Sequence, residues 1–268
     1  MAVFPAILLG ILQGITEFLP ISSTGHLLLA HAIFGASGTD LAFDAVLQLA
    51  TALAVVVYFW SDLMILLNTA IRKLSRLPVN ERDLTLIYAL LIGTIPGVVF
   101  GLMLESLMES VFREPLLVAG VLVAGSVLFA YAEWRYLNSK REGSMSVKKG
   151  LIIGLFQALA LVPGMSRSGA SIAGGMLLGL SRSEAARFSF LLAVPIILGS
   201  GMKKLLDLLS GDASFSWPSL LIGSIVAFVV GLVAIHLMLS FVRSHTLWPF
   251  IWYRIILAGF VVFVVYFG

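Results

Sequence analysis

The stretch Gln13-Gly-Ile-Thr-Glu17-Phe-Leu-Pro-Ile-Ser22-Ser23-Thr24-Gly25-His26 interrupts an otherwise apolar segment at residues 1–34. A second polar stretch, Pro163-Gly-Met-Ser166-Arg167-Ser168-Gly169, interrupts residues 150–180 in the same way. Each half of either segment is shorter than the roughly 20 residues that a helix needs to cross hydrocarbon. Such broken segments are typical of re-entrant helix–turn–helix hairpins, which a membrane tolerates where protein or water surrounds the turn. We therefore expect two hairpins with polar tips.

The rest of the chain is apolar enough to lie in a lipid bilayer. Of its 268 residues, 60% are hydrophobic and 12% are charged, whereas soluble domains carry about 25% charged residues. Transmembrane spans are predicted at 42–60, 86–104, 116–134, 187–205, 218–240 and 249–267. The chain has no cysteine, which excludes disulfides and thiolate chemistry. The sequence thus predicts an all-α polytopic membrane protein.

Basic residues gather in two of the predicted loops. Residues 61–85 carry four Lys or Arg, and residues 135–149 carry five. The positive-inside rule places both loops in the cytoplasm, and it leaves the acidic loop at 105–115 and both termini outside. Because the basic residues are confined to loops, they indicate membrane orientation, and no nucleic-acid partner is expected.

The two halves of the chain resemble each other. Gln13 matches Gln157, and Ser22–Gly25 matches Ser166–Gly169, each at an offset of 144 residues. We interpret residues 1–134 as a first repeat and residues 150–268 as a second, within one membrane domain of residues 1–268. Each repeat holds one hairpin and three crossings, and because three is odd the second repeat is inverted. Inverted repeats with broken helices place their site near the midplane, where the breaks meet.

The first break offers a carboxylate, hydroxyls and an imidazole. Gln13 and Glu17 are four residues apart and therefore share one helix face. A carboxylate beside an amide suits a hard divalent cation such as Mg²⁺ or Ca²⁺. Residues Ser22, Ser23, Thr24 and Gly25 are good cap types for the next half-helix, whose free N–H groups bind phosphate. The spacing lets His26 reach the hydroxyl of Ser22 or Ser23.

The second break offers a guanidinium and a second set of caps. Arg167 takes the position equivalent to Ser23, while Leu161 stands opposite Glu17. The predicted site is therefore asymmetric. An arginine fork beside the Ser166, Ser168 and Gly169 caps suits a phosphorylated ligand, because guanidinium binds phosphate oxygens in pairs.

Structural roles compete with these assignments. Ser and Thr are common in membrane helices as packing and hydrogen-bonding residues. Glu17 and Arg167 are costly in hydrocarbon and usually functional there, but they also suit a purely structural ion pair. Thr51 either lines the site or bonds to its neighbours. Arg254, in the last span, is expected to extend its guanidinium to the membrane surface.

At these residues the chain resembles the bacterial undecaprenyl-diphosphatase family, also called bacitracin-resistance proteins. The resemblance lies in Gln13 to His26, in Pro163 to Gly169 and in Phe188-Ser-Phe-Leu-Leu-Ala-Val-Pro195. Many members carry Glu where this chain has Gln13, which leaves Glu17 as the main acidic ligand. The resemblance implies hydrolysis of undecaprenyl diphosphate to the monophosphate and inorganic phosphate, which recycles the carrier for cell-wall synthesis. It further implies a bacterial inner-membrane location, a site open to the periplasm, divalent-cation dependence and bacitracin tolerance.

The expected catalytic residues are Ser23, His26, Glu17 and Arg167. Glu17, with Gln13, holds the cation on the diphosphate, and Arg167 stabilises charge during transfer. Ser23 attacks the terminal phosphorus and His26 takes its proton. Ser22, His26 or a water activated by His26 remain alternatives for the nucleophile.

Two other classes of protein fit the same pattern. Paired broken helices in inverted repeats are also a transporter architecture, so a transporter or flippase of a phosphorylated polyprenyl lipid is the main alternative. A non-catalytic lipid-binding protein is the third. The imidazole beside hydroxyls favours the phosphatase, because transport does not require it. The sequence leaves a homo-oligomer open.

Overall fold

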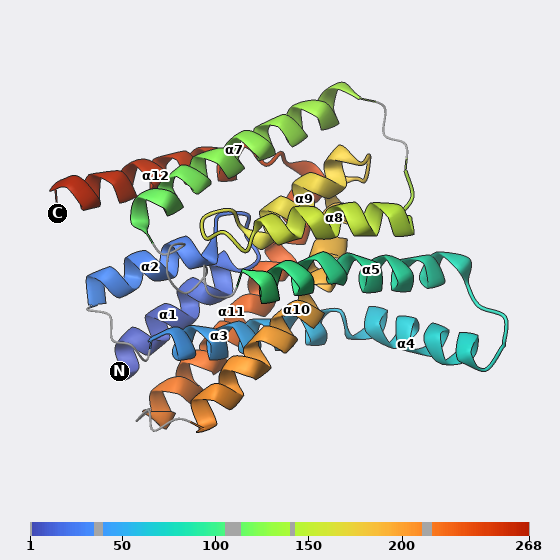
Figure 1. Cartoon of the computed structure of the whole chain (residues 1–268), viewed down its shortest axis with the longest axis horizontal. Helices are drawn as coiled ribbons and strands as arrows, with labels where there is room; N and C mark the ends of the chain where they lie inside the picture. The colour runs from blue at the N-terminus through green and yellow to red at the C-terminus, as the bar shows by residue number, and fades with distance from the viewer. Residues whose placement is uncertain (1, 35–39, 105–113, 140–142, 211–215, 268) are drawn as a thin grey trace.

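All of the secondary structure in the described residues is helical. The computed structural model describes residues 2–34, 40–104, 114–139, 143–210 and 216–267, and most of its helices run roughly along the long axis (Figure 1). The helices are α1 (Val3–Thr16), α2 (Ser23–Phe34), α3 (Asp40–Tyr58), α4 (Trp60–Leu74), α5 (Glu81–Met103), α7 (Pro115–Asn138), α8 (Val147–Leu159), α9 (Arg167–Leu177), α10 (Arg182–Ser210), α11 (Trp217–Ser244) and α12 (Trp248–Phe267).

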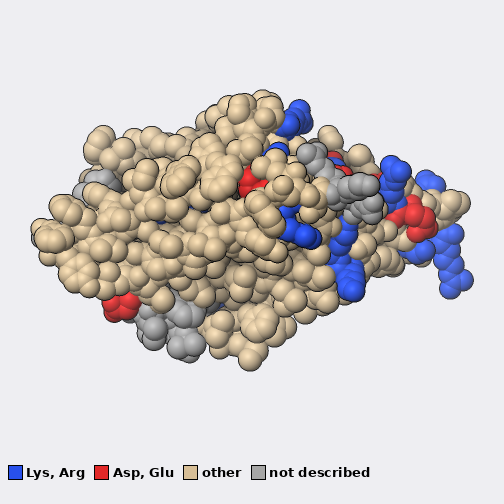
Figure 2. All heavy atoms as spheres, turned by 90° about the horizontal axis from the view of Figure 1, so that it is seen from above, with Lys and Arg blue, Asp and Glu red and all other residues tan. Residues whose placement is uncertain are grey.

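Five helices are long and apolar enough to cross a membrane. These are α5, α7, α10, α11 and α12, and they coincide with five of the six predicted spans. The prediction of a multi-pass, all-helical membrane protein is therefore confirmed. On the face that Figure 2 shows, most of the surface carries no Lys, Arg, Asp or Glu, and Lys and Arg gather toward the end at which α4 lies (Figures 1 and 2). The acidic loop predicted at 105–115 lies outside the described residues except for its last two.

The predicted loop at 61–85 is wrong for most of its length. Its first part forms α4, which is bent by 74° from α3, and α5 already begins at Glu81. Only residues 75–80 connect the two helices. The helix is amphipathic, with Asp62, Arg72 and Lys73 among apolar residues, so it contains no uninterrupted apolar run of the kind that predicts a membrane span. The sixth predicted span, 42–60, corresponds to α3, which passes as a span only together with α4.

Glycines bring α1 against α11 and α8 against α5. A Cβ at Gly10 would lie 2.5 Å from the Gly223 carbonyl oxygen, and a Cβ at Gly150 would lie 2.6 Å from the Ala89 Cα. Real Cβ atoms do not come this close to backbone, so only glycine permits these approaches. Small residues at helix interfaces are a common way to pack membrane helices. These contacts fix α1 and α8, each of which carries one polar turn at its C-terminal end.

A buried carboxylate ties three parts of the bundle together. The Glu133 side chain is fully buried on α7 and forms an ion pair with Arg182 at the start of α10. It also accepts a hydrogen bond from the Leu247 backbone N–H at 3.3 Å, in the connection between α11 and α12. The Arg182 guanidinium lies 4.1 Å from the centroid of the Tyr136 ring. The buried charge therefore has both an ionic and a hydrogen-bonding partner, as its burial requires.

Candidate functional site

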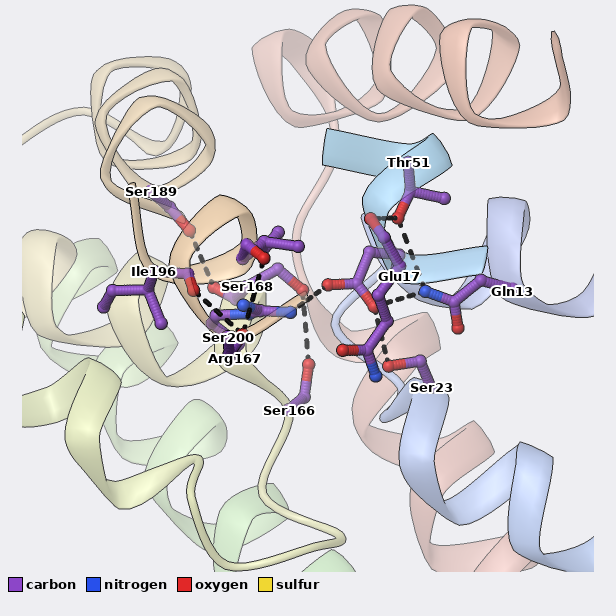
Figure 3. A network of polar contacts seen from close by, with 12 residues as sticks. Gln13, Glu17, Ser23, Thr51, Ser166, Arg167, Ser168, Ser189, Ile196 and Ser200 are labelled. Carbon is purple, nitrogen blue, oxygen red and sulfur yellow. Dashed lines mark hydrogen bonds and ion pairs between the residues drawn. The ribbon is translucent and has the colours of Figure 1, made fainter. Parts of the chain in front are cut away.

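The two polar turns meet through Glu17 and Arg167. An Arg167 Nη2 donates to Glu17 Oε1 in an ion pair (Figure 3). The carboxylate side chain is only 3% exposed, whereas that of Arg167 is 21% exposed. Ser168 Oγ also donates to the Leu19 carbonyl oxygen at 3.2 Å. Residues about 150 positions apart in sequence thus form one polar junction, as the sequence predicts.

The carboxylate of Glu17 accepts hydrogen bonds from its own turn as well. Gln13 Nε2 donates to Glu17 Oε2 at 3.0 Å, which confirms the shared helix face, and Ser23 Oγ donates to the same oxygen at 2.9 Å. Gln13 Nε2 also lies 3.4 Å from Thr51 Oγ1, so Thr51 contacts the site through the amide. Figure 3 shows these side chains converging on the carboxylate. The junction therefore holds Ser23 and Arg167 on different oxygens of one carboxylate.

The two turns have the same cap geometry. Ser22 and Ser166 both adopt positive φ, 76° and 72°, which is uncommon for residues other than glycine. Ser22 Oγ accepts from the Gly25 N–H at 3.3 Å, and Ser166 Oγ accepts from the Gly169 N–H at 3.2 Å. Each hydroxyl satisfies one of the free N–H groups at a helix N-terminus. The predicted caps are therefore present, although Thr24 is exposed.

His26 does not contact the hydroxyl group of Ser22 or Ser23, although the spacing in the sequence places both within its reach. Its Nδ1 lies 2.7 Å from the Ser22 carbonyl oxygen, and its Nε2 lies 2.6 Å from the Tyr253 hydroxyl. The hydroxyls of Ser22 and Ser23 have other partners, the Gly25 N–H and the Glu17 carboxylate. The expected direct contact between His26 and a serine hydroxyl is thus wrong for this conformation.

The position of Arg254 differs most from the one that the sequence predicts. It was expected to reach the membrane surface, but it is fully buried. Its guanidinium donates to the carbonyl oxygens of Gly164 at 2.9 Å and Met165 at 3.1 Å, just before the second turn. It also donates to the Leu122 carbonyl oxygen and to Ser126 Oγ on α7. The rule that marked Arg167, a charge within an apolar span, applies equally to Arg254.

Ser189 on α10 is a second residue of the site that the sequence prediction did not include. Ser171 Oγ and Ser189 Oγ lie 2.5 Å apart, and Ser171 Oγ also donates to the Arg167 carbonyl oxygen at 2.6 Å. These bonds hold the first turn of α9 against α10, near the Glu17–Arg167 pair (Figure 3). A small cavity beside that pair is lined by Glu17, Phe18, Arg167, Ser168, Ser189, Phe190, Ala193 and Ile197. Ser189 lies within the Phe188–Pro195 stretch that carries the family resemblance, but a single hydroxyl in an apolar span gave no chemical reason to assign it to the site.

The oxygen atoms of Gln13 and Glu17 at the junction suit a hard cation, but they are too few to hold it without further oxygen ligands. In the parts of the chain that the structure describes, no three His, Cys, Asp or Glu side chains cluster as a metal site. Gln13 Oε1, however, is buried without a hydrogen-bond partner, and its amide nitrogen contacts Glu17. One carboxylate and one free amide oxygen are the ligand types that Mg²⁺ and Ca²⁺ prefer. The remaining ligands must then come from substrate oxygens or water.

Comparisons with known proteins cover almost the whole chain. A family model described as bacitracin resistance protein BacA matches residues 6–260. A protein of Thermobifida fusca named undecaprenyl-diphosphatase is 41% identical over 270 residues, covering 100% of this chain and 92% of its own. Proteins of the same name from Myxococcus xanthus and Pelotomaculum thermopropionicum are 40% and 38% identical, covering 96% and 98% of this chain and 87% and 97% of their own. The family match includes both polar turns.

Proposed function

The chain belongs to the bacitracin resistance protein BacA family, and from that premise we propose how its polar junction carries out the reaction. The protein is an undecaprenyl-diphosphate phosphatase of the membrane. It hydrolyses undecaprenyl diphosphate to undecaprenyl phosphate and inorganic phosphate, and so recycles the lipid carrier for cell-wall synthesis. The observation that carries the site assignment is the contact of Glu17 with both Ser23 and Arg167.

The architecture in this proposal is an inverted repeat with two re-entrant hairpins. The matched caps at Ser22 and Ser166 support it, because they lie 144 residues apart and share φ and hydrogen-bond pattern. From their turns, α1 and α2 extend toward the end where α1 begins and α12 ends, while α8 and α9 extend toward the end that holds α4 (Figure 1). Hairpins that enter from opposite ends bring their tips together inside the bundle. In this arrangement the α4 end faces the cytoplasm of a bacterial inner membrane, and the site takes substrate from the periplasmic side.

Diphosphate binding separates the Glu17–Arg167 pair in the proposed mechanism. The guanidinium of Arg167 turns to the phosphoryl oxygens, for which its fork is well suited. The free N–H groups of the two capped half-helices, around Thr24 and Ser168, bind further oxygens. Glu17 Oε2 keeps its hydrogen bond with Ser23. The Ser23 hydroxyl attacks the terminal phosphorus as the Glu17 carboxylate takes its proton. Arg167 stabilises the charge that develops, and undecaprenyl phosphate leaves.

Hydrolysis of the phosphoserine completes the cycle. Water attacks the phosphorus, the bond from phosphorus to Ser23 Oγ breaks as Glu17 returns the proton to that oxygen, and inorganic phosphate leaves. His26 takes the proton from this water in our proposal, since the geometry places it away from Ser23 itself. Ser22 suits the nucleophile less well than Ser23, because its hydroxyl caps α2 and is buried.

A covalent intermediate tests this assignment. Purified protein in detergent, where no gradient can drive transport, is expected to release phosphate from prenyl diphosphate. Acid quenching during turnover with terminally labelled substrate should leave label on Ser23, and Ser23→Ala should lose both the label and nearly all phosphate release. Ser22→Ala is the matched control. It should lose less phosphate release than Ser23→Ala, because it removes only the cap of α2. Absence of label, with single inversion at phosphorus, would remove the serine role; binding without phosphate release by wild type would favour the transporter or the lipid-binding protein.

We propose that Gln13 and Glu17 hold a divalent cation, Mg²⁺ or Ca²⁺, when substrate is bound. The cation would neutralise diphosphate charge and polarise the phosphorus. Chelation with EDTA is expected to abolish phosphate release by the wild type, and added Mg²⁺ or Ca²⁺ should restore it. Gln13→Glu adds a second carboxylate, so it should lower the cation concentration that gives half-maximal rate. An equal cation requirement in Gln13→Glu, Gln13→Ala and wild type would contradict the assignment of these ligands.

A further inference from the structure

Both ring nitrogens of His26 have hydrogen-bond partners, and one partner fixes the position of the proton. Nδ1 lies 2.7 Å from the Ser22 carbonyl oxygen. A carbonyl oxygen only accepts hydrogen bonds, so Nδ1 carries the hydrogen in the neutral and in the charged ring. Nε2 is therefore the nitrogen at which His26 gains and loses a proton. The chemistry of this histidine takes place on its Nε2 side.

The Tyr253 hydroxyl lies at this nitrogen. It is 2.6 Å from Nε2, and the two rings are nearly parallel, with an interplanar angle of 5°. A phenol both donates and accepts, so it can donate to the neutral imidazole and accept from the charged one. Tyr253 is 42% exposed, whereas His26 is 7% exposed. The phenol therefore stands between the buried imidazole and the outside of the protein.

The orientation of Tyr253 is set by the next residue. Arg254 is fully buried and holds α12 against α7 through its bonds to the Leu122 carbonyl oxygen and Ser126 Oγ. Consecutive residues on a helix point about 100° apart, so α12 directs Arg254 into the bundle and Tyr253 toward α2. Through these two residues α12 contacts the second turn at Gly164 and the first turn at His26.

We propose that Tyr253 is a positioning residue for His26 and the route by which a proton reaches it. This inference rests on the proposed role of His26 in hydrolysis of the phosphoserine. The Ser22 carbonyl oxygen holds the imidazole as the Nδ1–H tautomer, and the hydroxyl of Tyr253 holds the ring with its basic Nε2 facing the phenol. As the attacking water gives a proton to the phenol oxygen, the phenol passes its own proton to Nε2. The Ser23 oxygen takes back its own proton from Glu17 as its bond to phosphorus breaks, and the proton on His26 leaves through the phenol after inorganic phosphate has gone.

Removal of one oxygen atom tests the proposal. Tyr253→Phe is expected to lower kcat on the order of tenfold, the scale seen when an orienting partner of a metal-bound histidine is lost. KM for prenyl diphosphate and the thermal midpoint should stay unchanged, because Tyr253 has no proposed contact with substrate. Tyr266→Phe removes the same atom from an exposed tyrosine on the same helix and should leave all three quantities unchanged.

Nitrogen NMR of the histidines gives a readout that does not depend on turnover. With ¹⁵N-labelled histidine, the His26 ring, assigned by its absence from His26→Ala, should show one Nδ1–H tautomer in wild type and in Tyr266→Phe. Tyr253→Phe should keep this tautomer, which the Ser22 carbonyl oxygen sets, but should shift the Nε2 resonance, because Nε2 loses its hydrogen bond with the phenol. An unchanged Nε2 resonance and an unchanged kcat in Tyr253→Phe would overturn the proposal. If His26→Ala kept wild-type phosphate release, the role of His26 itself would fail, and with it this inference.

Discussion

Arg167→Ala is expected to reduce phosphate release from prenyl diphosphate by at least about a hundredfold, the usual cost of losing one donor that stabilises transition-state charge. The residue forms an ion pair with the buried Glu17 and is itself partly exposed, so it is placed to exchange a carboxylate for a phosphate. Arg167→Lys keeps the charge but not the fork and should recover only part of the activity. Phosphate release by purified variants in detergent measures the effect.

The competing role of this pair is structural. Removing one partner of a buried ion pair costs about 3–5 kcal/mol, because the other charge is left uncompensated. The double variant Glu17→Gln, Arg167→Gln leaves no such charge and should fold, but should remain inactive. Arg187→Ala, which breaks an exposed ion pair with Asp62, should leave activity unchanged. Activity within a few-fold of wild type for Arg167→Ala or for the double variant would contradict the two-hairpin site.

Arg254→Met should lower the thermal stability of the protein markedly. The guanidinium is fully buried, donates to four oxygen atoms and lies 4.6 Å from the Phe129 ring centroid. Met keeps much of the side-chain volume but removes the donor to the Gly164 and Met165 carbonyl oxygens, each at a cost of about 1–3 kcal/mol, while the Leu122 carbonyl oxygen keeps the Ser126 hydroxyl as a donor. The loss should also release the segment before Ser166, so phosphate release should fall with stability.

Thermal unfolding in detergent, followed by circular dichroism, measures this effect. Arg243→Met is the matched control, since Arg243 is exposed in the last turn of α11 and its replacement should leave the midpoint unchanged. Arg254→Lys keeps the charge but cannot reach several carbonyl oxygens at once, so it should be intermediate. An unchanged thermal midpoint in Arg254→Met would show that the second polar turn does not depend on the hydrogen bonds from Arg254.

The spans and the meeting of the two turns were accessible from sequence because both rest on strong local signals. Apolar runs of about 20 residues predict crossings, and a Glu or Arg within such a run is costly enough to need a partner. The caps at Ser22 and Ser166 follow equally from residue type and position. In contrast, α4 has Asp62 in its first turn and Arg72 in its last turn, so its sequence contains no uninterrupted apolar run.

The partners of His26 and Arg254 could not be predicted from the sequence, because they lie far from these residues along the chain. Tyr253 is 227 residues from His26, and the oxygens that bind Arg254 are 89 to 132 residues away. Local spacing predicted that His26 would reach Ser22 or Ser23, but spacing shows only which contacts are within range. The hydroxyl groups instead serve the Gly25 N–H and Glu17, a competition that only the folded arrangement decides.

The Glu133 contacts have a mechanical consequence. Because Glu133 contacts both Arg182 and the Leu247 N–H, α7, the start of α10 and the connection between α11 and α12 cannot move independently of one another at this place. Any rearrangement of the bundle that admits or releases the lipid is therefore expected to move these three parts as one rigid unit.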